Sequence, residues 1–344
     1  MTKTGLFSSS PPNFKLPRRN LTQKPTPGDS PFATAQFVVG MVMLRSLLSG
    51  WVACLMGFAF ANDHDWTPLW PGTAPGAPQP VAGTEIIKNN CLWSNVEVPQ
   101  YRTFLPDKPN GTSVVIFPGG GYQFVSFRNE GLRAAKELKA MGIAAMVVKY
   151  RVAGDDSLGY QFPVPLLDAR RAVRTMKHLA AEAGLDPKKV GVMGFSAGGH
   201  LAAMAATFQG KLAAETTDAI DQLNPAPAFA VLAYPVIGIG KKWGHGGSTR
   251  RLLGESPTDQ AIAAADPLQH LSKETPPVFL IHCADDNPVP LRNSLEFAQA
   301  CRNHKVPVGI KVFPFGGHGF GAPGNKHTDG WLQELPAFLK SQKL

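Results

Sequence analysis

The chain has 344 residues, of which 44% are hydrophobic and only 17% are charged, a composition that suits one large globular domain or two small ones. The formal net charge of +9 is concentrated near the start, because residues 1–61 hold six basic residues and a single acidic one. Residues 62–344 carry 28 basic and 24 acidic residues, with no basic helix and no lysine- or arginine-rich run interleaved with aromatics. This distribution gives no indication of a nucleic acid partner.

Residues 1–40 are rich in proline and serine, carry scattered basic residues and show no hydrophobic periodicity. The next segment, residues 41–61, has the pattern of a secretory signal peptide, and such a peptide should stand at the N-terminus. The simplest explanation is therefore that translation starts at Met41 or Met43 and that the upstream segment is an over-extended reading frame. A tethered, disordered leader is the alternative.

The signal-peptide prediction rests on three features of residues 41–61. Arg45 supplies a short basic start, residues 47–60 are uncharged and apolar, and the segment ends in the small-x-small sequence Ala59-Phe60-Ala61. The apolar stretch is too short to span a bilayer. We therefore expect a secreted or periplasmic protein, cleaved after Ala61 and without a stable membrane anchor afterwards. A buried helix is the alternative, although no amphipathic stripe supports it.

The folded domain is predicted to occupy residues 62–344. Three cysteines fall within it, Cys91, Cys283 and Cys301, and an odd number cannot all pair within one chain. No Cys-x-x-Cys or Cys/His spacing indicates zinc. At most one disulfide is expected, and the sequence does not say which.

Hydrophobic patterns define the elements of this domain. Residues 62–100 are rich in turn formers and predict a surface segment with short antiparallel strands. After them, continuous apolar runs predict buried strands, and apolar residues at helical spacing predict helices. In chain order these are a strand at Thr112–Phe117, a helix at Glu130–Gly142, a strand at Ile143–Tyr150, a helix at Pro165–Leu185, a strand at Lys189–Phe195, a helix at Gly198–Phe208, strands at Ala228–Ile237 and Pro276–Ala284, a helix at Leu291–His304, a strand at Val308–Phe315 and a helix at Asp329–Gln342.

Strands that alternate with helices and are apolar throughout predict an α/β fold with a mostly parallel, doubly wound sheet covered on both faces. Between Gly238 and Thr275 the alternation gives way to glycine-rich and mixed-charge sequence. We interpret this stretch, about residues 238–275, as a small cap or lid inserted into the domain.

The pentapeptide from Gly194 to Gly198, with Ser196 at its centre, joins a predicted strand to a predicted helix. A serine on such a sharp turn adopts a strained backbone conformation that raises its hydroxyl above the sheet. Glycines two residues before and after it let the strand and the helix approach each other. The helix N-terminus also directs free N–H groups at developing negative charge. In this context the motif indicates a nucleophile rather than an ordinary turn.

A serine nucleophile needs a base and an orienting acid, and in a doubly wound sheet both should follow later strands. The predicted strand at residues 276–284 runs into Asp285 and Asp286, and the last strand runs into a glycine-rich loop that holds His318. The order Ser, Asp, His is that of α/β-hydrolases. We predict His318 as the base, with a surface-loop histidine as the alternative. Asp286 is preferred as the acid over Asp285, which is then a solvated or structural carboxylate.

The oxyanion hole should combine the N–H that follows the nucleophile, that of Ala197, with donors from an earlier strand's loop. The loop after the strand at residues 112–117 contains three consecutive glycines, which let backbone amides turn inward. We predict Gly120 and Gly121 as donors, with Gly119 shaping the turn. A flexible loop is the alternative.

Four segments together resemble the esterase/lipase branch of the α/β-hydrolase superfamily, in particular exported bacterial acetyl xylan or feruloyl esterase-like enzymes. These segments are Pro118–Tyr122, Gly194–His200, Asp286–Pro290 and His318–Gly321, and the resemblance extends over nearly all of residues 64–342. It implies an α/β-hydrolase fold, a Ser-His-Asp triad, no metal or other cofactor, and a short acyl ester of a polysaccharide as substrate. The sequence departs from this pattern at Pro118, where hormone-sensitive-lipase-like relatives carry histidine. Because this residue precedes the three glycines, the resemblance does not fix which acyl group is preferred.

Two further groups have structural interpretations. His200 lies four residues along the predicted helix from the serine and is expected to pack within the fold rather than act as the base. On the long helix, Asp168 is expected to form a structural pair with Arg171 or Arg170.

The leading prediction is a secreted or periplasmic serine esterase that hydrolyses short acyl esters, with acetate on a polysaccharide such as xylan as the expected case. Tyr122, Trp243 and His245 are candidate substrate-pocket residues. One alternative is a peptidase or amidase of the same fold, although prolyl-oligopeptidase-like relatives carry Tyr where this chain has Ala197. The other is a non-catalytic binding protein that has kept the fold. The complete triad argues against it.

Overall fold

The computed structural model describes residues 65–76, 85–89, 91–152, 160–212 and 218–344. The predicted upstream segment at residues 1–40 and the predicted signal peptide at residues 41–61 lie outside the described residues. In the described ranges, no helix combines the length and the apolar character that a membrane crossing requires.

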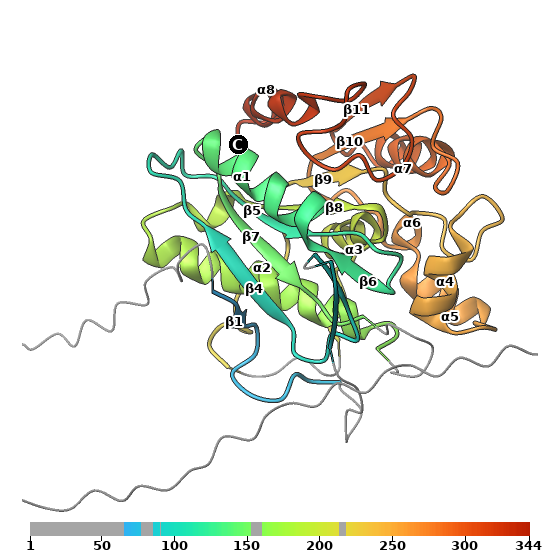
Figure 1. Cartoon of the computed structure of the whole chain (residues 1–344), viewed down its shortest axis with the longest axis horizontal. Coiled ribbons are helices and arrows are strands. Elements are labelled where there is room, and N and C mark those ends of the chain that lie inside the picture. The colour runs from blue at the N-terminus through green and yellow to red at the C-terminus, as the bar shows by residue number, and fades with distance from the viewer. Residues whose placement is uncertain (1–64, 77–84, 90, 153–159, 213–217) are drawn as a thin grey trace, which may run out of the picture. The chain divides into compact units, whose positions relative to one another are not determined.

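A central sheet organises the described part of the chain (Figure 1). Its strands follow the order β1-β4-β7-β5-β8-β9-β10-β11, with β1 and β4 antiparallel to their neighbours and all pairs from β7 to β11 parallel. The strands are β1 (Thr67–Pro68), β4 (Gln100–Phe104), β5 (Ser113–Phe117), β7 (Ala144–Lys149), β8 (Val190–Phe195), β9 (Ala230–Ala233), β10 (Val278–Cys283) and β11 (Val308–Phe313). A smaller antiparallel sheet consists of β2 (Ile86–Lys88), β3 (Leu92–Ser94) and β6 (Phe124–Ser126).

Helices flank the central sheet (Figure 1). They are α1 (Arg133–Ala140), α2 (Val164–Glu182), α3 (Ser196–Thr207), α7 (Arg292–Asn303) and α8 (Leu335–Ser341), with a π-helical turn η1 (Arg128–Leu132) and 3₁₀ turns η2 (Pro187–Lys189) and η3 (Trp331–Glu334). The helices α2 and α3 pack against each other and against β8, and every residue of α3 is buried. The predicted doubly wound α/β architecture is confirmed, because parallel strands with apolar side chains on both faces need helices on both sides.

Three predicted elements differ in detail. The strand expected at Ala228–Ile237 ends at Ala233, since Tyr234 adopts a left-handed φ of 37° and leaves the extended conformation. The last strand, β11, lies at the sheet edge and leaves Ile310 and Val312 about 40% exposed, so it is not covered on both faces. The helix expected from Glu130 begins two residues earlier, in the π-helical turn η1.

The predicted cap at residues 238–275 holds three short helices between β9 and β10. They are α4 (Gly246–Leu253), α5 (Asp259–Ala265) and α6 (Pro267–His270). Side-chain caps start all three: His245 for α4, Thr258 for α5 and Asp266 for α6. Figure 1 shows these helices grouped beside α3 and α7.

The predicted pairing of Asp168 with Arg170 or Arg171 is wrong. Asp168 is fully buried and faces Arg151, which follows β7 and binds the carboxylate through two side-chain bonds of 2.8 and 2.9 Å and a backbone bond of 3.0 Å. Trp70 donates a fourth hydrogen bond to the same carboxylate. The helical i, i+3 spacing is overridden here because Asp168 points into the domain, where the Arg151 guanidinium is its partner. Cys91, Cys283 and Cys301 are free thiols.

Candidate active site

Ser196 stands where β8 ends and α3 begins, with a left-handed φ of 52°. That conformation is strained for a residue with a Cβ and persists only where surrounding contacts enforce it. Here the enforcing contacts are the close approaches of backbone at the two flanking glycines, Gly194 and Gly198. A Cβ on Gly194 would overlap the backbone of Gly198, and a Cβ on Gly198 would overlap the carbonyl of Phe117 at the end of β5. The close approach of strand and helix therefore requires both glycines, as the motif predicts.

His318 connects Ser196 to Asp286 through two short contacts. Its Nε2 lies 2.8 Å from the Ser196 Oγ, and its Nδ1 lies 2.7 Å from the Asp286 Oδ2. The three residues follow β8, β10 and β11, whose carboxyl ends meet at the same edge of the parallel sheet (Figure 1). The structure thus brings together side chains that are 122 and 32 residues apart in the sequence.

Asp286 is held as a carboxylate that can orient an imidazole. Burial alone raises its pKa, but hydrogen bonds from His282, His318 and the Val289 backbone, together with the charge of His318, lower the pKa to about 2. Its neighbour Asp285 accepts hydrogen bonds from the backbone N–H groups at positions 316 and 317 instead. Asp285 therefore fastens the loop that carries His318, which agrees with the structural role expected of it.

His282 is a part of this arrangement that sequence reasoning missed. It lies on β10, fully buried, with Nδ1 2.7 Å from the Ser294 hydroxyl and Nε2 2.8 Å from the Val289 carbonyl. The same Nε2 lies 3.3 Å from the Asp286 Oδ2. A histidine four residues before the acid, inside a buried strand, was the available signal, since a buried imidazole needs partners for both nitrogens.

Glu130 is a second missed residue. The buried carboxylate accepts hydrogen bonds from the Gly119 backbone N–H at 2.8 Å and from the Tyr234 hydroxyl at 2.8 Å. The Tyr234 hydroxyl in turn accepts from the Gly321 N–H, and the Tyr234 ring lies edge-on to His318. Burial raises the pKa of Glu130 despite these hydrogen bonds and the nearby His318. The Glu130 carboxylate thus binds the triple-glycine loop directly and the loop that carries His318 through Tyr234.

Of the predicted oxyanion donors, Gly120 and Gly121 line the same cavity as Ser196, and Ala197 follows Ser196 directly. Gly120 and Gly121 adopt φ values of 134° and 65°, which favour glycine, and Ala197 lies in the first turn of α3, where N–H groups have no intrahelical acceptor. In the described part of the chain, no acceptor binds the N–H of Gly120 or Gly121. Gly119 is held by Glu130, which is consistent with its expected role of shaping the turn. The role of these N–H groups in catalysis stays a prediction.

A cavity of about 340 Å³ opens beside Ser196 and His318. Its lining combines small, apolar and polar residues: Gly120, Gly121, Gln123, Phe124, Ser126, Asn129, Glu130, Ser196, His245, Arg251, Pro288, His318 and Gly319. The predicted pocket residue His245 is among them, but Tyr122 and Trp243 are not. Tyr122 is buried and its hydroxyl lies 2.6 Å from the His200 Nδ1, while the Trp243 ring packs over Gly238 and Arg292. Neither side chain therefore lines the cavity.

His200 is buried within the fold, as expected. Its Nε2 lies 2.7 Å from the carbonyl of Ala265 on α5, and its Nδ1 faces Tyr122, so a neutral ring with the proton on Nε2 satisfies both partners. Burial lowers its pKa to about 4, although the Ala265 contact opposes this shift. His200 thus connects the helix of the nucleophile to the triple-glycine loop and to α5, and it does not contact Ser196.

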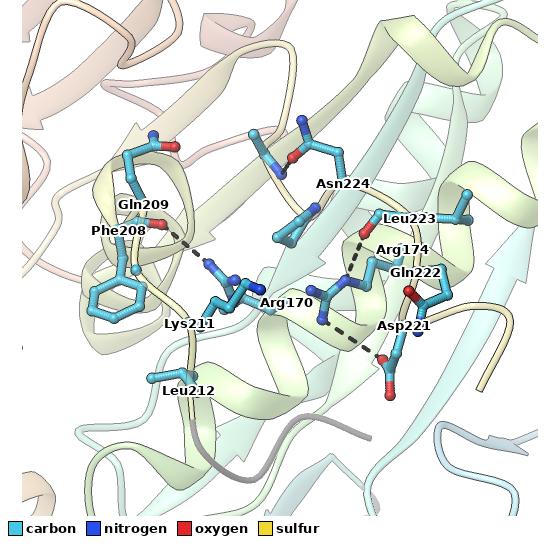
Figure 2. Close-up of a pocket in the computed structure, with 13 residues that line it drawn as sticks. Arg170, Arg174, Phe208, Gln209, Lys211, Leu212, Asp221, Gln222, Leu223 and Asn224 are labelled. Carbon is cyan, nitrogen blue, oxygen red and sulfur yellow. Dashed lines mark hydrogen bonds and ion pairs between the residues drawn. The ribbon is translucent and has the colours of Figure 1, made fainter. Parts of the chain in front are cut away.

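A second cavity, of about 520 Å³, lies between α2 and the connection that follows α3 (Figure 2). Arg174 donates to the Leu223 carbonyl and lies 3.6 Å from Asp221, and Arg170 donates to the Phe208 carbonyl. These contacts direct both guanidinium groups to the chain itself. We therefore interpret them as fastening the connection to α2. In the described ranges, no cluster of three His, Cys, Asp or Glu side chains is arranged to hold a metal ion.

Comparison with known proteins agrees with this geometry. Residues 103–301 match the BD-FAE family. The chain is 33% identical over 251 residues to an acetylxylan esterase of Xylanibacter ruminicola, covering 69% of this chain and 47% of that protein. It is 34% identical over 227 residues to an endo-1,4-beta-xylanase B of Butyrivibrio fibrisolvens, covering 63% of this chain and 34% of that one. The chain thus spans about half or less of the length of these two curated relatives.

Solved structures extend the comparison. An acetyl ester-xyloside bifunctional hydrolase from Caldicellulosiruptor lactoaceticus matches with a TM-score of 0.69 and 32% identity, over 81% of this chain and 96% of that chain. A thermophilic esterase from Thermogutta terrifontis, solved with propionate bound, matches with a TM-score of 0.60 and 26% identity, over 77% of this chain and 96% of that chain. The resemblance predicted from the four sequence segments is confirmed.

Proposed function

The chain belongs to the BD-FAE family of α/β-hydrolase esterases, and from that premise we propose that it is a serine esterase which removes short acyl groups, above all acetyl, from carbohydrates such as xylan. The observation that carries the proposal is the continuous contact from Ser196 through His318 to Asp286, with distances of 2.8 and 2.7 Å. A serine hydroxyl is a poor nucleophile, and a histidine base that is oriented by a carboxylate makes it reactive.

In this proposal Ser196 attacks the ester carbonyl while His318 accepts its proton. Asp286, ionised over the whole working range because its pKa is near 2, holds the imidazole in the required tautomer and stabilises the imidazolium. The negative charge on the carbonyl oxygen is stabilised by N–H groups of Ala197 and of the triple-glycine loop, each contributing about 2.7–4 kcal/mol. His318 then protonates the leaving alcohol, and water hydrolyses the acyl-enzyme by the reverse sequence.

Support for a short acyl group comes from the cavity and from the relatives. A volume of about 340 Å³ has to hold both the acyl group and part of the alcohol, which leaves little room for a long chain. The name of one relative refers to acetylxylan, that of a second refers to an acetyl ester and a xyloside, and a third relative was solved with propionate bound.

A direct test compares the protein with its Ser196→Ala variant on p-nitrophenyl acetate, on longer p-nitrophenyl esters and on acetylated xylan. We expect kcat/KM to fall as the acyl chain lengthens, acetate to be released from xylan, and the alanine variant to lose activity on every ester. Equal hydrolysis by a folded alanine variant would contradict the proposal. A preference for long acyl chains would leave an esterase but refute the acetyl assignment.

Export is proposed on the sequence of residues 41–61 alone. N-terminal sequencing of protein recovered outside the cytoplasm should begin at Asn62. A mature chain that begins well before Asn62, or one that stays in the cytoplasm, would refute the cleavage and the localisation.

A further inference from the structure

One cation in the cavity beside Ser196 has no protein partner among the described residues. Arg251, in the last turn of α4, lines this cavity, and its Nε is buried without a hydrogen-bond partner. No acidic side chain in the described ranges forms an ion pair with it. The neighbouring Arg250 differs, because it is exposed and lies 3.4 Å from Glu255.

An unmatched guanidinium nitrogen is unfavourable in a buried position, since it has lost water without gaining an acceptor. Arg251 itself is half-buried, and the buried side chains of Arg151 and Arg171 do have acceptors, in Asp168 and Asp218. The acidic groups near the cavity are already engaged: Asp286 binds His318, and Glu130 binds Gly119 and Tyr234. Arg251 therefore offers a planar set of donors to whatever enters the cavity.

The environment of Arg251 favours an anion over a neutral group. His245 lies at the start of the same helix and accepts a hydrogen bond from the Ser248 N–H on Nδ1, which leaves its proton on Nε2. Burial lowers the pKa of His245, the positive charges of His318 and Arg251 lower it further, and the carboxylate of Asp286 opposes the shift. Both side chains thus present donors to the cavity, and a guanidinium fork matches a carboxylate in geometry as well as charge.

Resting on the esterase function above, we propose that Arg251 is a specificity-determining residue that binds a carboxylate of the substrate alcohol. The substrate class is then acyl esters of acidic carbohydrates, in which a uronic acid lies next to the ester. The volume of about 340 Å³ exceeds what an acetyl group occupies, so part of the sugar can share the cavity with it.

The test uses two substrates, an O-acetylated glucuronic acid glycoside and its carboxyl methyl ester, in which a methyl group removes the charge, and it measures the acetate released from each. For the unaltered protein we expect kcat/KM for the free acid to exceed that for the methyl ester at least tenfold, which corresponds to about 1.4 kcal/mol. In Arg251→Gln the ratio should fall to near one, and Arg251→Lys should retain part of it because the charge remains. Arg250→Gln, on the exposed face of the same helix, is the matched control and should keep the full ratio. Added salt should reduce the preference of the unaltered protein.

A ratio near one in the unaltered protein, or a ratio that Arg251→Gln leaves unchanged, overturns the assignment of Arg251 and leaves the esterase proposal intact. Failure of the esterase proposal looks different. In that case the folded protein hydrolyses neither sugar ester nor p-nitrophenyl acetate any faster than Ser196→Ala does.

Discussion

Replacing His200 with glutamine should weaken the dependence of stability on pH. The folded-state pKa of His200 is about 4, below its ordinary value of 6.5, because the ring is buried as a neutral group between Tyr122 and Ala265. Between these two values the unfolded chain binds a proton that the folded chain does not. Folding stability therefore falls as the pH drops from about 6.5 to 4, and the contribution of this residue is constant below that range.

The size of the effect follows from the difference between the two pKa values. One pKa unit corresponds to 1.36 kcal/mol. Over the whole interval from pH 6.5 to pH 4, His200 therefore lowers the free energy of unfolding by about 3 kcal/mol, and about 2 kcal/mol of this is lost between pH 7 and pH 5. Urea unfolding followed by tryptophan fluorescence at both pH values measures it. His304→Gln removes an exposed histidine and serves as the control.

We expect the free energy of unfolding to drop between pH 7 and pH 5 by about 2 kcal/mol less in His200→Gln than in the unaltered protein. His304→Gln should show no such difference. Equal losses in the unaltered protein and in His200→Gln would refute the conclusion that the buried ring is neutral and held by these two partners.

Four further substitutions test other parts of the site and the fold. Glu130→Gln has one carboxamide oxygen for two donors, the Gly119 N–H and the Tyr234 hydroxyl, so one of them loses its acceptor. Steady-state kinetics on p-nitrophenyl acetate should then show kcat reduced on the order of 10–100-fold, with less change in KM. An unchanged kcat would contradict the role of Glu130 in fixing the glycine loop. Asp168→Asn breaks the fully buried pair with Arg151 and should lower the free energy of unfolding by about 3–5 kcal/mol in urea titrations, whereas a loss below 1 kcal/mol would show that the pair matters little. Asp286→Asn should reduce kcat by about 10⁴-fold, and Asp285→Asn far less. A larger loss in Asp285→Asn than in Asp286→Asn would show that Asp285 is the acid.

The fold and the meeting of three side chains were predictable because they depend on local patterns. Buried parallel strands are apolar throughout, and the residues that follow them collect at one edge, so sequence position alone predicts that Ser196, Asp286 and His318 lie close together. The close packing at Gly194 and Gly198 likewise follows from the motif. These features require no knowledge of which side chains meet across the domain.

Contacts of side chains that do not follow the parallel strands were not predictable in the same way. Asp168 was expected to pair along its own helix, but the carboxylate faces Arg151, which follows strand β7. Glu130 reads as an ordinary polar residue near the start of a helix, and only the π-helical turn η1 and the position of Tyr234 bring it to the glycine loop. Tyr122 follows the triple glycine directly, yet it turns inward to His200 and leaves the cavity to His245 and Arg251 from the cap.

Covalent trapping of the nucleophile tests the central claim most directly. The full chain is incubated with paraoxon, the modified residue is identified by peptide mass mapping, and residual activity on p-nitrophenyl acetate is followed in parallel. We predict a single modification on the Ser196 Oγ, a loss of activity in proportion to it, and no modification of Ser196→Ala. Modification at another residue that accompanies inactivation, or full activity in a chain modified at Ser196, would contradict the account.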